Sequence, residues 1–140
     1  MMFVLDTSVV SELRRARTGR ADARVVAWAN GVLAASLFVS VVTVLELEQG
    51  VLLAERRDAA QGRVLRRWLD TQVMPAFEGR VLPIDVAVAL RCAALHVPDR
   101  RGERDALIAA TAPVHGMAVA TRNVADFAPT GVRLVDPWAA

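Results

Sequence analysis

The 140-residue sequence contains no lysine and no tyrosine, and it has one cysteine, Cys92. A single cysteine excludes an intrachain disulfide and a cysteine-rich zinc site, and its ordinary interpretation is a small buried core residue. The absence of lysine argues strongly against a phosphate-handling receiver domain, because that class needs a lysine beside its acids. All 17 basic residues are therefore arginine, whose planar guanidinium can donate paired hydrogen bonds to a phosphate.

The sequence also lacks a long hydrophobic run. The apolar stretch from Leu37 to Leu45 is interrupted by Ser40 and Thr43, well short of the roughly 18 residues that a membrane span requires. No basic segment precedes the first apolar residues, and Asp6 stands where a signal peptide would still be hydrophobic. We therefore expect a cytoplasmic protein that makes no contact with the membrane. Its length and its 54% hydrophobic content predict one domain, residues 1–140.

Short β-branched or apolar runs alternate with segments of helical periodicity. The sequence predicts strands at 3–5, 37–42, 81–84, 117–121 and 132–135, and helices at about 7–14, 23–33, 43–58, 59–73, 86–96 and 105–112. Thr43 and Asp85 are expected to cap helices, and Pro75 is expected to end the helix before it. This alternation favours an α/β fold with a mostly parallel sheet covered on both faces, a three-layer α/β/α domain.

Three acids lie at the boundaries of the predicted elements. Asp6 follows the first strand, Glu46 lies in the first turn of a predicted helix, and Asp105 begins another. Each helical acid alone has a structural explanation: Glu46 as the capping-box partner of Thr43, and Asp105 as a favourable charge at a helix N-terminus. If the fold gathers all three, each pair of charges at 4 Å repels by about 4 kcal/mol at an effective dielectric of 20. Such a cluster favours a hard divalent cation, Mg²⁺ or Mn²⁺.

Four segments of the sequence, taken in order, resemble the motifs of PIN-domain ribonucleases. They are Val4–Val10, Ser40–Leu47 with Gly50, Asp105–Ala112 and Thr121–Phe127, with a closing Pro137-Trp138. The pattern is similar to the VapC-type toxin branch, and in particular to its FitB-like subgroup. The resemblance implies a PIN-like fold and a metal-dependent endoribonuclease that is the toxin of a toxin–antitoxin pair.

The same resemblance implies partners. They are an RNA substrate, a cognate antitoxin protein that inhibits the enzyme, a second copy of the chain in a homodimer, and DNA contacted only through the antitoxin. The alternative function is a weakly active PIN-domain subunit of a DNA-binding regulatory complex. The presence of all three acids argues against that alternative.

The family's metal-binding acids correspond to Asp6, Glu46 and Asp105. Asn123 stands where many members have an acid, and Asp126 is a further catalytic candidate three residues later. Asn123 and Asp126 are therefore secondary candidates for metal binding, after the three acids. Two hydroxyl residues beside these motifs either orient ligands and water or serve as ordinary caps and turns: Thr7 and Thr121.

Several other polar and aromatic residues leave alternatives open. Arg100, Arg101 and Arg104 precede or begin the predicted helix at 105, where they either contact RNA phosphates or carry solvated charge. A metal-free mechanism would need His96 and His115 as an acid and base pair, although ordinary cap roles suit both better. Trp28 and Trp68 are expected in the core rather than stacked on bases, and Pro113 is expected to end or kink its helix early.

Overall fold

Five short strands form one sheet, in the order β3-β2-β1-β4-β5, in a computed structural model that describes residues 1–139. The strands are β1 (Phe3–Leu5), β2 (Leu37–Ser40), β3 (Val81–Leu82), β4 (Ala118–Ala120) and β5 (Leu134–Val135). Each pair of neighbouring strands runs parallel. The carboxyl ends of the strands therefore meet at one edge of the sheet, as the sequence predicts.

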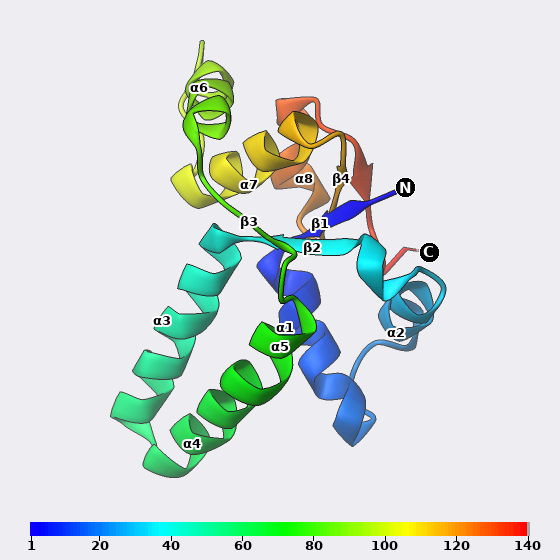
Figure 1. Ribbon diagram of the computed structural model, residues 1–140, viewed down its shortest axis with the longest axis vertical. Helices are drawn as coiled ribbons and strands as arrows, with labels where there is room; N and C mark the ends of the chain where they lie inside the picture. The colour runs from blue at the N-terminus through cyan, green and yellow to red at the C-terminus, as the bar shows by residue number, and fades with distance from the viewer. Residues whose placement is uncertain (140) are drawn as a thin grey trace.

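Helices cover both faces of this sheet (Figure 1). The α-helices are α1 (Thr7–Arg14), α2 (Ala23–Asn30), α3 (Val41–Arg57), α4 (Ala59–Trp68), α5 (Met74–Ala76), α6 (Val86–Leu95), α7 (Glu103–Val114) and α8 (Val124–Phe127). A π-helical turn, η3 (Leu69–Val73), joins α4 to α5, and 3-10 turns occur at η1 (Arg15–Thr18), η2 (Ala34–Ser36) and η4 (Ala128–Thr130). In Figure 1, α7 and α8 lie on one side of the sheet, and α1, α2 and α5 lie on the other. The three-layer architecture is confirmed.

Successive residues of β1 show why helices pack on both faces of the sheet. Val4 and Leu5 are both fully buried, but their side chains point to opposite faces. Val4 belongs to the core with Ile108 and Phe127, whereas Leu5 belongs to the core with Val9. A strand that is apolar on both faces is typical of a parallel sheet between helical layers.

The boundary between β2 and α3 differs from the sequence prediction. The helix begins at Val41, and the Ser40 hydroxyl caps it by accepting a 3.0 Å hydrogen bond from the Val42 N–H. The prediction that Thr43 is the cap is therefore wrong, and Glu46 lies in the second turn rather than the first. Serine caps at least as well as threonine, so the earlier hydroxyl starts the helix inside a run that looks like continuing strand.

Two prolines were also expected to interrupt helices. Pro75 instead lies in α5, which follows the π turn η3 directly, so the helical stretch continues through this proline to Ala76. Helix α7 includes Pro113 and ends one residue later, at Val114, so the helix does not stop before the proline. The chain then turns at Gly116, whose φ of 68° is left-handed, and Met117 N donates to the Ala112 carbonyl at 2.8 Å.

Two further predictions concern which residues lie in the core and whether any helix could span a membrane. Cys92 is buried, and Trp28 and Trp68 pack against the core cluster that contains Leu5, as predicted. Within residues 1–139, no helix has both the length and the apolarity to span a bilayer.

Candidate metal centre

Asp6 lies at the carboxyl end of β1 and caps helix α1. Only 4% of its surface is exposed. Its Oδ1 accepts from the Thr7 N–H at 2.8 Å, and its Oδ2 accepts from the Ser8 hydroxyl at 2.9 Å and from the Thr121 hydroxyl at 2.8 Å. These three donors fix the carboxylate against the ends of β1 and β4, and they compensate much of its desolvation.

Glu46 reaches the same edge of the sheet from α3. Its Oε1 accepts a 2.7 Å hydrogen bond from the Thr7 hydroxyl, whose oxygen lies 3.1 Å from that of Thr43. The capping-box interpretation of Glu46 is therefore wrong. Thr7 links two of the acids, since its backbone N–H binds Asp6 while its hydroxyl binds Glu46. The structure thus gives Thr7 an orienting contact, and Thr121 makes the corresponding contact with Asp6.

Asp105 is the least compensated acid of the cluster. It lies half-buried in the first turn of α7. Burial raises the pKa of Asp105, and the negative charges of Asp6, Asp126 and Glu46 raise it further. Asp105 is therefore close enough to each of the other three carboxylates to be repelled by it. Oxygen-rich sites with such excess negative charge suit a hard divalent cation, so the donor set fits Mg²⁺ or Mn²⁺.

Both secondary candidates for metal binding come from the segment that follows β4. The Asn123 N–H donates to the Thr121 hydroxyl at 2.9 Å, but the Asn123 side chain makes no capping hydrogen bond to α8. Asp126 is exposed in the first turn of α8 and lines a hollow of about 410 Å³ together with Asp105. Asp126 therefore shares a surface with Asp105, whereas Asn123 is linked to Asp6 alone, through Thr121.

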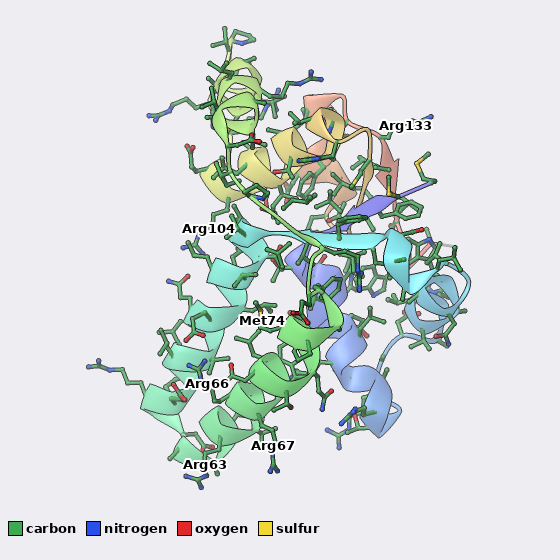
Figure 2. All side chains as sticks on the ribbon, in the orientation of Figure 1. Arg63, Arg66, Arg67, Met74, Arg104 and Arg133 are labelled. Atoms are coloured by element: carbon green, nitrogen blue, oxygen red, sulfur yellow. The ribbon has the colours of Figure 1, made fainter. Side chains whose placement is uncertain are left out.

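The three arginines near α7 have different surroundings. Arg100 and Arg101 line the same hollow as Asp105. The Arg101 guanidinium is held by backbone carbonyls, donating to Leu95 at 2.8 Å and to Pro129 at 3.2 Å. Arg104 lies next to the first turns of α3 (Figure 2), where it donates to the Gln49 side chain at 2.8 Å and stands 3.8 Å from the Glu46 carboxylate. Of the three, Arg100 is the most available to a phosphate.

Sequence reasoning did not single out two residues that position the acids. Ser8 binds Asp6, and Thr43, expected only as a cap, is fully buried with its hydroxyl against that of Thr7. The signal for Ser8 is present in the sequence, since Asp and Ser two residues apart at a strand end commonly bond locally. Thr43 shows no such signal, because its contact crosses from α3 to α1.

A second group of possible metal ligands consists of Cys92, His96 and Glu103, with one atom of each within 4.8 Å of the others. His96 Nδ1 accepts a 3.0 Å hydrogen bond from the Arg101 N–H. A neutral imidazole that accepts at Nδ1 carries its proton on Nε2, the atom that faces Glu103 and Cys92. That nitrogen has no lone pair for a cation, so this group does not fit a metal.

The two histidines do not form a common site. His96 contacts Glu103 at the start of α7, whereas His115 caps the other end of that helix. Twelve residues at a rise of about 1.5 Å separate Glu103 from His115 by about 18 Å. The structure therefore provides no histidine pair for a metal-free mechanism.

Comparison with known proteins gives results that agree with this geometry. A family model described as the PIN domain matches residues 3–128. A VapC ribonuclease from Sinorhizobium fredii is 37% identical, covering 98% of each chain, and the toxin FitB from Neisseria gonorrhoeae is 35% identical, covering 98% of this chain and 99% of FitB. The crystal structure of FitAcB from Neisseria gonorrhoeae matches with a TM-score of 0.89 at 34% identity, covering 99% of this chain and all of the other.

Proposed function

The chain belongs to the PIN-domain family, and we propose that it is a metal-dependent endoribonuclease that acts as the toxin of a toxin–antitoxin pair. The observation that carries the proposal is the cluster of Asp6, Glu46 and Asp105 at the carboxyl edge of the sheet, where burial and the neighbouring carboxylates raise the pKa of Asp105. We propose residues 1–140 as one PIN domain that works in the cytoplasm, where RNA is available.

We assign the metal to Asp6, Glu46 and Asp105, with Asp126 and Asn123 as outer ligands, and we favour Mg²⁺ or Mn²⁺. When bound, such an ion activates water and neutralises charge on a transferring phosphate. The chain's own residues hold two of the acids in place: Thr7, Ser8 and Thr121 donate to Asp6, and Thr7 donates to Glu46, so these two carboxylates would stay in position without the cation. No side-chain nucleophile is needed.

We also propose that Arg100, Arg101 and Arg104 form the positive margin of this acidic site. Arg100 is the one expected to contact an RNA phosphate directly. Arg101 shapes the hollow through its bonds to Leu95 and Pro129, and Arg104 partly screens Glu46. The arginine margin would draw the RNA backbone toward acids that otherwise repel it.

The partners follow from the family. FitAB, the complex containing FitB, has also been solved bound to a DNA fragment. We propose that this chain likewise binds a cognate antitoxin, that it contacts DNA only through that antitoxin, and that it forms a homodimer. Helix α6 and the segment after it carry exposed apolar side chains that a second copy of the chain could cover. The exposed fractions are 74% for Val86, 68% for Leu90 and 74% for Val97. A weakly active subunit of a DNA-binding complex remains the alternative function, and the intact acidic cluster favours the nuclease.

The proposal is tested with purified chain, freed of antitoxin, incubated with a mixed RNA pool. Cleavage is expected with Mg²⁺ or Mn²⁺ and is expected to stop in EDTA. Glu46→Gln should remove cleavage, while Glu78→Gln, an exposed acid away from the cluster, should leave it intact. Absence of cleavage under every metal condition would favour the DNA-binding alternative.

A further inference from the structure

A large hollow lies away from the acids, between α1, η1 and α4. Its volume is about 680 Å³. Four arginines line it, together with one aromatic ring and one amide: Arg14, Arg17, Arg63, Arg67, Trp68 and Gln72. We call it the arginine groove. No acidic residue is among its lining residues, so it concentrates positive charge in a chain whose net charge is only +2.

These four arginines lack acidic partners, unlike their neighbour Arg66. Arg66 faces α3 and pairs with Glu48 at 2.7 Å and Glu55 at 3.4 Å, and with Asp70 at 3.5 Å. Among the ion pairs of residues 1–139, none includes an arginine of the groove. Figure 2 shows Arg66 on the side of α4 toward α3, Arg63 near the turn between α3 and α4, and Arg67 on the side of α4 away from α3.

The arginines of the groove lie close enough in the sequence for their positive charges to repel one another and to lower the stability of the fold. Arg63 and Arg67 are four residues apart on α4, and Arg14 and Arg17 are three apart across the end of α1. Like charges at such positions repel and destabilise a helix. Arg14 also stacks on Trp68, with its guanidinium carbon 5.8 Å from the ring centroid. The groove is therefore set up to receive an anion that makes several contacts.

We propose that the arginine groove binds the backbone of the RNA substrate, as a docking site separate from the acids. This inference rests on the proposed ribonuclease function. Helix α1 joins the two places: Asp6 caps its start and Arg14 ends it, eight residues or about 12 Å further along. A strand of a few nucleotides can span that distance. The acidic centre repels phosphates, so binding energy has to come from cations elsewhere.

A polyanion suits this groove better than an apolar segment of a partner protein. An adjoining apolar hollow, lined by Leu13, Val73 and Phe77 among others, measures about 130 Å³, roughly a fifth of the arginine groove. The arginine groove also has the apolar side chains of Ala60 and Val64 in its lining, but four guanidinium groups without acidic partners face it. Trp68 packs against the core and already has Arg14 over its ring, so the contact expected with single-stranded RNA is from the guanidinium groups to the phosphates.

The test compares Arg63→Gln/Arg67→Gln with the control Arg91→Gln/Arg133→Gln, which removes two exposed arginines outside the groove. The full-length chain is titrated in EDTA with a labelled single-stranded RNA of about 20 nucleotides over a range of salt. The groove variant is expected to bind on the order of tenfold more weakly. Its negative slope of log affinity against log salt should become shallower by about 1.4, or 0.7 for each lost phosphate contact. The control should match the parent.

Cleavage with Mg²⁺ gives the second readout. The groove variant should show a raised KM on the RNA of about 20 nucleotides and an unchanged kcat on one of about 4 nucleotides. Binding and cleavage equal to the control would overturn the proposal. So would loss of antitoxin binding with RNA affinity unchanged, because the groove would then serve an acidic peptide. A parent that binds RNA through these arginines but never cleaves it would instead refute the proposed function alone.

Discussion

Asp6 and Asp105 have the same side chain but opposite surroundings. Asp6 is almost fully buried and accepts three hydrogen bonds, from Thr7, Ser8 and Thr121. Asp105 is half-buried, and burial together with neighbouring carboxylates raises its pKa. The fold therefore depends on the charge of Asp6, whereas the charge of Asp105 costs the metal-free protein stability.

Asp105→Asn should abolish cleavage while slightly stabilising the metal-free fold. The gain should stay below about 1 kcal/mol, because solvent screens a half-exposed group. A carboxyl whose pKa is raised in the folded state contributes stability at pH values below its ordinary pKa. That contribution is lost as the pH rises through the raised pKa. The advantage of Asp105→Asn should therefore grow from about pH 4 to about pH 7 in urea unfolding with EDTA present. Glu103→Gln, in the same helical turn, is the control, and a gain that is independent of pH would contradict the repulsion argument.

Asp6→Asn should also abolish cleavage, but it should destabilise the fold. An amide nitrogen in place of one carboxylate oxygen faces donors instead of accepting from them, which leaves buried polar groups unpaired at a cost of about 1–3 kcal/mol. The measurement is the same urea titration, made beside Asp105→Asn. Equal stability of the two variants would show that the hydrogen bonds to Asp6 carry little energy.

At the scale of elements, α3 and α4 form a hairpin in which Gly62 of α4 lies directly against the backbone of α3. A Cβ on Gly62 would lie 2.5 Å from the Glu55 Cα and 2.8 Å from its backbone nitrogen. Backbone atoms cannot move aside as a flexible side chain does, so the two helices would have to separate. Gly50, in the middle of α3, has no atom within 4 Å of the corresponding position.

The two glycines give a matched pair of substitutions. Gly62→Ala should destabilise the fold by about 1–3 kcal/mol, as overpacking does. Gly50→Ala should stabilise it by about 0.5–1 kcal/mol, because alanine loses less conformational freedom in a helix. Thermal unfolding of both variants checks the signs. A stabilised Gly62→Ala would mean that the hairpin is looser than its geometry indicates.

The sequence predicts most of these elements, because apolar periodicity reflects burial on one or both sides. It misplaces the start of α3, since Val41 and Val42 look like strand and only the Ser40 cap shows otherwise. It also misses the π turn before Pro75 and the short helix α8. These features depend on tertiary packing and local hydrogen bonding, which a periodic pattern does not record.

At the scale of the whole molecule, the three acids lie up to about a hundred residues apart in sequence, and the parallel topology brings them together. Four ordered motifs predicted which acids belong together and the strand edge at which they lie, while their role as metal ligands stays a prediction. The hydroxyls that hold them were only partly predictable: Thr7 and Thr121 adjoin the motif acids, whereas the contact of Thr43 crosses between helices. The arginine groove was not predictable, because its residues come from α1, η1 and α4, which only the fold places side by side.

The reaction products distinguish hydrolysis at the acidic cluster from every mechanism that uses the RNA's own 2′-hydroxyl. If water attacks phosphorus in line, the bond to the ribose O3′ breaks, and that oxygen leaves with a proton. The products should then carry a 5′-phosphate and a 3′-hydroxyl. Attack by the 2′-hydroxyl would instead leave a cyclic or 3′-phosphate and a 5′-hydroxyl.

The structure favours the first outcome, because Asp6, Glu46 and Asp105 share one site while His96 and His115 stand at opposite ends of α7. RNA in which a 2′-deoxy nucleotide replaces the one at the cleavage site should still be cut, since the 2′-hydroxyl takes no covalent part. End-group labelling of products made with Mg²⁺ measures both features. Products with 5′-hydroxyl ends, formed equally well in EDTA and lost with the 2′-deoxy substrate, would refute the carboxylate mechanism.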